Sequence, residues 1–126
     1  MTDTSHQSKR DFKAGEIIMR QGAKGDCAYI IEDGVVEIFI EREGGKIQNV
    51  GTRGAGAIIG EMAIVDDAPR TATVKAVKDC KMLEITRDDF ANRLKSSDPV
   101  LQMISQVILT RYRDTPRFLP IEPGRR

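Results

Sequence analysis

The chain has 126 residues, the size of one domain, and its 40% hydrophobic residues are enough for a single core. A formal net charge of +1 provides no strong field for nucleic acid or an anionic membrane, and the absence of Trp disfavours a surface that binds single strands by stacking. The apolar runs are only a handful of residues long, far below the roughly 20 that a membrane span needs.

The first ten residues are polar and contain no apolar stretch of the kind found in secretory signals. We expect a disordered head over 1–10 and a cytoplasmic location. The single histidine, His6, lies in this head, and the two cysteines, Cys27 and Cys80, lack the spacing of metal ligands. The sequence therefore predicts two reduced cysteines, no metal site and no histidine-based catalysis.

Short segments with β-strand character follow the head, separated by turn signals. They are residues 16–19, 28–32, 35–42, 47–50, 73–77 and 82–85. Asp33-Gly34 and Gly44-Gly45 are tight-turn dipeptides, and a glycine-rich stretch over 51–60 interrupts the pattern. Short strands at this spacing predict an antiparallel β jelly-roll barrel rather than a parallel α/β sheet.

Helical signals appear only after the last predicted strand. Thr86 and Asp89 resemble a capping box that opens one helix, and Asp98 followed by Pro99 opens a second. The second helix carries an apolar stripe made of Val100, Ile104, Val107 and Ile108. We expect one structured domain over 11–114, with a short helix within the barrel, C-terminal helices after it, and a loose tail over 115–126.

The segment with the clearest chemistry runs from Gly60-Glu61 to Arg70-Thr71. Gly60 permits a sharp turn, and exposed amides at the start of a short helical turn attract anions. The planar guanidinium of Arg70 matches a phosphate, whereas the carboxylate of Glu61 accepts a hydrogen bond from a hydroxyl such as a ribose 2′-OH. An acceptor for sugar and a donor for phosphate, nine positions apart, are typical of a nucleotide site.

Gly60-Glu61-Met62-Ala63 followed by Pro69-Arg70-Thr71-Ala72-Thr73-Val74 resembles the phosphate-binding cassette of cyclic-nucleotide-binding domains. That family includes the catabolite activator protein, regulatory subunits of cyclic-nucleotide-dependent kinases and nucleotide-gated channels. The resemblance extends from about Phe12 to about Leu109 and includes Gly25-Asp26 and Gly34-Val35-Val36.

The resemblance implies a role for each matching residue. Glu61 would bind the ribose 2′-hydroxyl and Arg70 the cyclic phosphate, while Asp26 would hold Arg70 from behind. The implied ligand-binding set is Gly60, Glu61, Met62, Ala63, Arg70, Thr71 and Ala72. The last helix would cover the base, with Arg111 or Tyr112 as the covering side chain. Asp26 is explained equally well as an ordinary turn residue.

The resemblance implies a sensor without catalytic activity, whose ligand is cAMP or cGMP and which needs no cofactor. Thr71 could accept a hydrogen bond from a syn guanine, yet its hydroxyl could equally serve the phosphate. We therefore expect both nucleotides to bind, with cAMP as the physiological ligand.

The implied partner is an unidentified effector protein or domain, with no direct contact to nucleic acid or membrane. A homodimer is left open. Two alternatives also stay open. One is the ligand-binding part of a catabolite-activator-type transcription regulator without its DNA-binding domain, and the other is a docking scaffold that has lost ligand binding.

Overall fold

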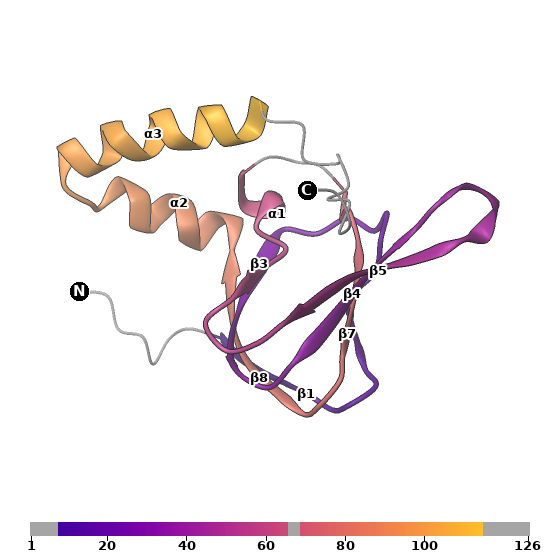
Figure 1. The fold of residues 1–126 in the computed structure, drawn as a ribbon. Coiled ribbons are helices and arrows are strands. Elements are labelled where there is room, and N and C mark those ends of the chain that lie inside the picture. Colours follow the sequence, from indigo (N-terminus) through magenta and orange to yellow (C-terminus); the bar gives the residue numbers. More distant parts are fainter. Residues whose placement is uncertain (1–7, 66–68, 115–126) are drawn as a thin grey trace.

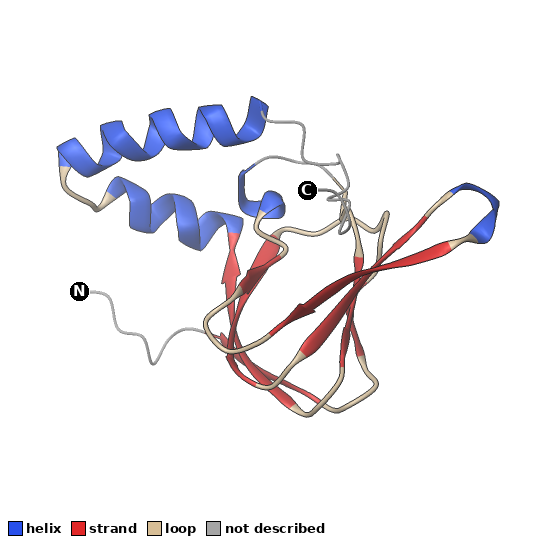
Figure 2. Cartoon of the chain, in the orientation of Figure 1, coloured by secondary structure: helices blue, strands red, loops and turns tan. Residues whose placement is uncertain are grey.

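Two four-stranded antiparallel sheets enclose the core of the protein in the computed structural model, which describes residues 8–65 and 69–114 (Figures 1 and 2). The first sheet has the order β1 (Ser8–Phe12), β8 (Cys80–Thr86), β3 (Cys27–Asp33) and β6 (Ile58–Ile59). The second has the order β2 (Ile17–Met19), β7 (Thr73–Ala76), β4 (Val36–Glu41) and β5 (Ile47–Arg53). This architecture confirms the predicted antiparallel β fold.

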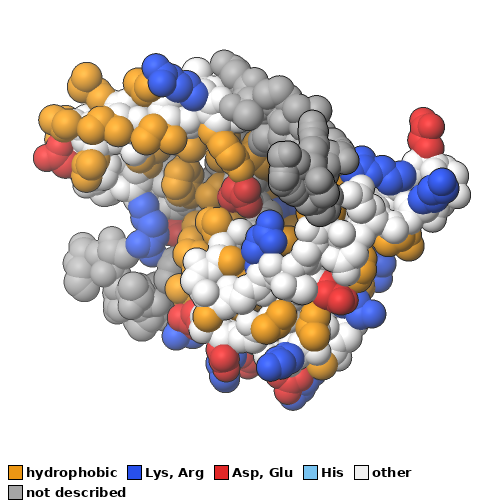
Figure 3. All heavy atoms as spheres, in the orientation of Figure 1, with side chains coloured by type: hydrophobic (Ala, Val, Ile, Leu, Met, Phe, Trp, Pro, Cys, Tyr) orange, Lys and Arg blue, Asp and Glu red, His pale blue; other side chains and the backbone are white. Residues whose placement is uncertain are grey.

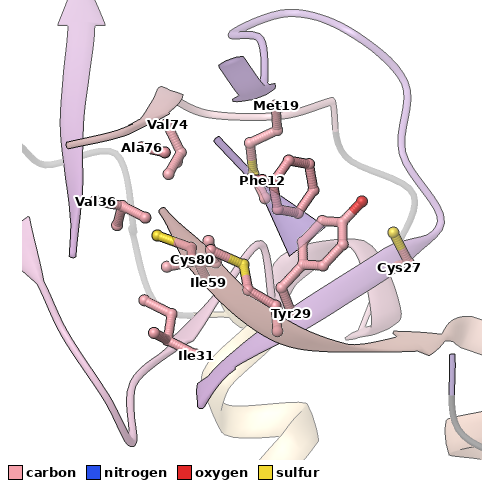
Figure 4. Close-up of a cluster of buried hydrophobic side chains, with 11 residues drawn as sticks. Phe12, Met19, Cys27, Tyr29, Ile31, Val36, Ile59, Val74, Ala76 and Cys80 are labelled. Carbon is pink, nitrogen blue, oxygen red and sulfur yellow. The ribbon is translucent and has the colours of Figure 1, made fainter. Parts of the chain in front are cut away.

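The core lies between the two sheets and consists of side chains that alternate inward along the strands (Figure 4). Ile31, Val36 and Met82 are buried almost completely. The ring of Phe12 meets that of Tyr29 edge to face, with centroids 5.8 Å apart. Cys27 and Cys80 are both buried and free, so they contribute packing and form no disulfide.

Strand β1 begins at Ser8, so the prediction of a disordered head over 1–10 is wrong for residues 8–10. Ser8 pairs with Glu84 and Phe12 with Cys80, so β1 forms the edge of the first sheet. Four of its five residues are exposed, which removes the apolar alternation by which a strand is recognised. The guanidinium of Arg10 bonds Glu84 at 3.2 Å. Residues 1–7 and the predicted tail over 115–126 lie outside the described residues.

Three helices lie together at one end of the barrel: α1 (Met62–Val65), α2 (Arg87–Lys95) and α3 (Pro99–Asp114) (Figure 1). Thr86 Oγ1 accepts a hydrogen bond from the backbone N–H of Asp89 at 3.0 Å, which confirms the predicted cap of α2. Asp98 Oδ1 accepts from the N–H of Val100 at 2.7 Å and caps α3 in the same way. Within the described residues, no helix is both long and apolar enough to cross a bilayer.

Helix α3 carries an exposed apolar surface. Six of its large apolar side chains are at least 49% exposed: Val100, Leu101, Met103, Ile104, Val107 and Ile108. Figure 3 shows apolar side chains gathered over this end of the molecule. The predicted stripe therefore exists, but most of it does not pack onto the barrel.

Candidate functional site

The backbone of Arg70 is anchored to the loop between β2 and β3. Its N–H donates to the carbonyl of Ala23 at 2.9 Å, and its carbonyl accepts from the N–H of Gly22 at 2.8 Å. These two bonds join segments that are far apart in the sequence. They place the half-buried Arg70 side chain at the end of the first sheet.

The guanidinium of Arg70 is seated between two glycines. Nη1 donates to the carbonyl of Gly60 at 3.2 Å, and Nη2 lies 3.6 Å from the sulfur of Cys27. A methyl group at Gly25 would lie 2.3 Å from Nε of Arg70, and one at Gly60 would lie 2.7 Å from Nη1. Gly60 also has a φ of +73°, in the region that favours glycine. Both glycines therefore make room for the guanidinium.

The charge of Arg70 has no acidic partner among the residues that the structure describes. Its neighbour Cys27 does not supply a negative charge, because burial raises the pKa of this thiol. Among the described residues the guanidinium is thus a permanent cation without an acidic partner, at a half-buried position. Such a group attracts an anion, and its fork suits two oxygens of a phosphate.

Glu61 lies directly before α1 and is contacted by the last turn of α3. The hydroxyl of Tyr112 donates to Glu61 Oε2 at 2.6 Å. A carboxylate has two oxygens that each accept more than one hydrogen bond, so Glu61 can accept from Tyr112 and from a second hydroxyl. Glu61, which is predicted to bind the ribose, and Tyr112, one of the two predicted base covers, are therefore direct neighbours.

Helix α1 is connected to both C-terminal helices through its own carbonyl groups. Arg87 Nε donates to the carbonyl of Ala63 at 2.9 Å, and Arg113 Nη2 donates to the carbonyl of Val65 at 3.3 Å. Carbonyls at the end of a helix have no partner within the helix, so arginines satisfy them well. Helix α1 is therefore bonded to both α2 and α3.

A cavity of about 200 Å³ opens between α1, the segment 69–72 and the second sheet. All seven predicted ligand-binding residues line it, namely Gly60, Glu61, Met62, Ala63, Arg70, Thr71 and Ala72. The structure therefore brings the two halves of the predicted cassette together around one space. Within that set, the N–H of Ala63 donates to the carbonyl of Gly60 at 3.1 Å and already serves the first turn of α1.

Asp26 and Arg111 have a less direct relation to this cavity. Asp26 is exposed and borders a neighbouring cavity of about 420 Å³ that Arg70 also lines. Within the described chain no ion pair joins Asp26 to Arg70, and the Asp26 carbonyl accepts from the N–H of Arg87 at 2.7 Å. Support of Arg70 by Asp26 stays a prediction. Neither Arg111 nor Tyr112 lines the cavity itself, but Arg111 is exposed whereas Tyr112 bonds the cavity residue Glu61, so Tyr112 is the better placed of the two predicted base covers.

Several residues that line the cavity were not among the predicted ligand-binding residues, although Pro69 and Val74 belong to the quoted cassette. They come from strands β2, β4, β5, β6 and β7 and from the segment before Arg70: Met19, Ile38, Arg53, Ile58, Ile59, Pro69 and Val74. The predicted strand 47–50 ended three residues before Arg53, so nothing in the sequence placed Arg53 on an inner face. No cluster of His, Cys, Asp and Glu suited to a metal ion occurs in 8–65 or 69–114.

The family model for the cyclic nucleotide-binding domain matches residues 9–97. Among curated proteins, the chain is 30% identical over 101 residues to lysophospholipase nte1 of Aspergillus fumigatus, which covers 80% of the chain and 7% of that protein. It is 29% identical over 119 residues to the cAMP-dependent protein kinase regulatory subunit of Blastocladiella emersonii, which covers 94% of the chain and 29% of that protein. It is 27% identical over 110 residues to the cyclic AMP receptor protein of Thermus thermophilus, which covers 87% of the chain and 51% of that protein.

Among solved structures, the EAL enzyme Bd1971 in its halfsite-occupied form has a TM-score of 0.78 and 34% identity, over 85% of this chain and 96% of that one. The cAMP-bound and cGMP-bound forms of the same enzyme have TM-scores of 0.67 and 0.68 at 35% identity, each over 84% of this chain and 28% of the other. The chain spans 7% to 51% of the length of the three curated relatives described above. These relatives include regulatory proteins and enzymes that contain such a domain.

Proposed function

Because the chain belongs to the family of cyclic nucleotide-binding domains, we propose that it is a sensor that binds cAMP or cGMP in the cavity around Arg70 and Glu61. The observation that carries this proposal is the convergence of all seven cassette residues on one cavity, among them Arg70, whose guanidinium has no acidic partner within 8–65 and 69–114. Bd1971, with which the chain shares its fold at 35% identity, is named in cAMP-bound and cGMP-bound forms.

The phosphate end of the ligand belongs at Arg70. The guanidinium is fixed by Gly60 and Cys27 on one side, so its remaining donors can serve the cyclic phosphate. The cavity also includes the backbone around Met62 and Ala72, whose amides would complete the contact. A charge-assisted bond formed away from bulk water would supply much of the affinity.

The ribose end belongs at Glu61, where the 2′-hydroxyl would donate to the carboxylate that Tyr112 also contacts. Ligand and α3 would then share one acceptor, so binding and the position of α3 are coupled through Glu61. The ligand shifts α3 only to the extent that it binds one position of the helix more tightly than another. We call α3 the lid helix from here on.

The signal would pass from the cavity to α2 and the lid helix through Arg87, Tyr112 and Arg113, which join these helices to Glu61 and α1. We propose a regulatory rather than a catalytic role, because the matched family model is that of a ligand-binding domain and the similar proteins include a kinase regulatory subunit and a cyclic AMP receptor protein. The effector would be another protein or a further domain, and we place the protein in the cytoplasm.

Isothermal titration calorimetry with cAMP and with cGMP tests the proposal. We expect both to bind the wild-type domain, and Arg70→Leu to lose about 2–5 kcal/mol of binding free energy. Arg70→Lys should also bind weakly, since an ammonium cannot reproduce the fork. Arg42→Ala is a matched control, because Arg42 bonds Gln48 and does not line the cavity. Arg70→Leu with nearly unchanged affinity would place the phosphate elsewhere.

A further inference from the structure

The lid helix turns most of its apolar residues to solvent and a mainly polar side to the rest of the protein. The half-buried residues are three or four positions apart, which places them on one side of the helix: Gln102, Ser105, Leu109 and Tyr112. The six apolar residues that are at least 49% exposed lie on the other side (Figure 3). An amphipathic helix at a protein surface ordinarily buries its apolar side, so the lid helix is oriented the opposite way.

Hydrogen bonds at both ends hold the lid helix in this orientation. Near its start, the side-chain amide nitrogen of Gln102 donates to the carbonyls of Lys95 and Ser97, at 3.2 and 2.7 Å. In its last turn, Tyr112 donates to Glu61 at 2.6 Å. The helix cannot rotate its apolar side inward without breaking these bonds. A contiguous exposed apolar surface of this kind marks a site of interaction.

The charges along the lid helix are separated by sign. Residues 99–110 contain no charged side chain. Asp98 caps the N-terminus, whereas Arg111 and Arg113 make the last turn basic. Two such helices that lie parallel bring like charges together at both ends, and two that lie antiparallel bring opposite charges together. The macrodipoles of the two helices favour the antiparallel arrangement as well.

Five of the exposed apolar residues are also spaced symmetrically along the helix: Val100, Leu101, Ile104, Val107 and Ile108. The first two lie four and three positions before Ile104, and the last two lie three and four positions after it. In a two-fold symmetric pair of antiparallel helices, each residue meets the position at the same distance on the other side of the axis. With the axis at Ile104, every one of these five residues therefore meets an apolar residue of the second copy.

We propose that the exposed side of the lid helix binds the same side of the lid helix in a second copy of this chain, antiparallel and with the two-fold axis at Ile104. In this register Val100 of one copy packs on Ile108 of the other, and Arg111 lies opposite position 97, next to the acidic cap Asp98. One pair of 16-residue helices gives an interface at the lower end of the sizes of specific complexes, so we expect a dissociation constant in the micromolar range. The inference does not depend on nucleotide binding.

Sedimentation equilibrium of the full chain over a range of concentrations tests for the dimer. We expect a monomer–dimer equilibrium for the wild type. Ile104→Glu should raise the dissociation constant of the dimer about 100-fold or more, because it brings two like charges together at the axis. Ile104 is exposed, so this variant should fold, which thermal unfolding verifies. Ile47→Glu is the matched control, because Ile47 is an exposed isoleucine of β5, and it should leave the equilibrium unchanged.

Disulfide cross-linking tests the orientation of the two helices. Val100→Cys and Ile108→Cys, mixed and oxidised, should form a disulfide between the two variants. Neither should cross-link with itself, because two copies of one of these positions are eight residues, or about 12 Å, apart along antiparallel helices. The natural cysteines, Cys27 and Cys80, are buried and should give no cross-link in the wild type.

Three results would overturn the proposal. A wild type that stays monomeric at its highest soluble concentration would assign the apolar side of the lid helix to a different partner. A dimer whose dissociation constant is unchanged in Ile104→Glu would place the interface on another surface. Efficient cross-linking of Val100→Cys with itself would show that the two helices lie parallel.

Discussion

Gly25 provides a sharp test of how the phosphate cation is positioned. A methyl group at this position would lie 2.3 Å from Nε, 2.4 Å from Cζ and 2.6 Å from Nη2 of Arg70. Ordinary contact begins near 3.4 Å, so Gly25→Ala must displace the guanidinium by about 1 Å, the difference between 3.4 and 2.3 Å. The φ of Gly25 is not in the left-handed region, so the substitution acts by volume and not by backbone strain.

The displaced guanidinium is the end of a flexible side chain, so the substitution should change the stability of the fold only slightly. We expect Gly25→Ala to change the free energy of unfolding by less than about 1 kcal/mol. The affinity for the nucleotide should fall more strongly, because hydrogen bonds to a charged group contribute about 1.5–3 kcal/mol and need correct geometry. The dissociation constant for cAMP should rise between about ten-fold and a hundred-fold.

Calorimetry and thermal unfolding of the same samples separate the two effects. Gly54→Ala is the matched control, since it adds the same methyl group outside the left-handed region, where the nearest atom is 3.7 Å away. It should leave both the affinity and the unfolding temperature nearly unchanged. Affinity of Gly25→Ala within a factor of two of wild type would refute the idea that Gly25 sets the position of Arg70.

Three further predictions address the sugar, the lid helix and pH. Glu61→Ala should markedly lower the affinity for cAMP but barely change the weaker affinity for a 2′-deoxy analogue. Equal losses of affinity for the two ligands in calorimetry would make Glu61 a structural residue. Tyr112→Phe removes the bond to Glu61 and should raise the ligand dissociation rate several-fold in stopped-flow measurements. An unchanged rate would argue that this bond does not hold the lid helix over the ligand. Burial raises the pKa of Tyr29 to about 12, above its value near 10 in the unfolded chain. The folded state therefore keeps this proton between about pH 10 and 12, so the free energy of unfolding falls as the pH rises through that window; Tyr29→Phe should show a shallower fall in denaturant titrations, and an identical one would contradict the assignment.

Short-range signals in the sequence were sufficient for the features that depend on neighbouring residues. The cap of α2 at Thr86 and Asp89 and the short helix after Gly60 follow from backbone preferences and side-chain caps within a few positions. The same holds for most strands of the barrel. The link between Glu61 and Arg70 needed the family pattern as well, since the two are nine positions apart and their meeting depends on the loop.

Only the tertiary structure decided the contacts that join distant segments. Strand β1 exists because it pairs with β8, although four of its five residues are exposed. Arg53 faces the cavity because its register places it opposite Val36, and a shift of one residue would turn it to the other face. Tyr112 reaches Glu61 across 51 positions because α3 returns over α1. Sequence periodicity indicates that a segment is a strand or a helix, whereas register and docking are set by the packing of whole faces, which no local pattern encodes.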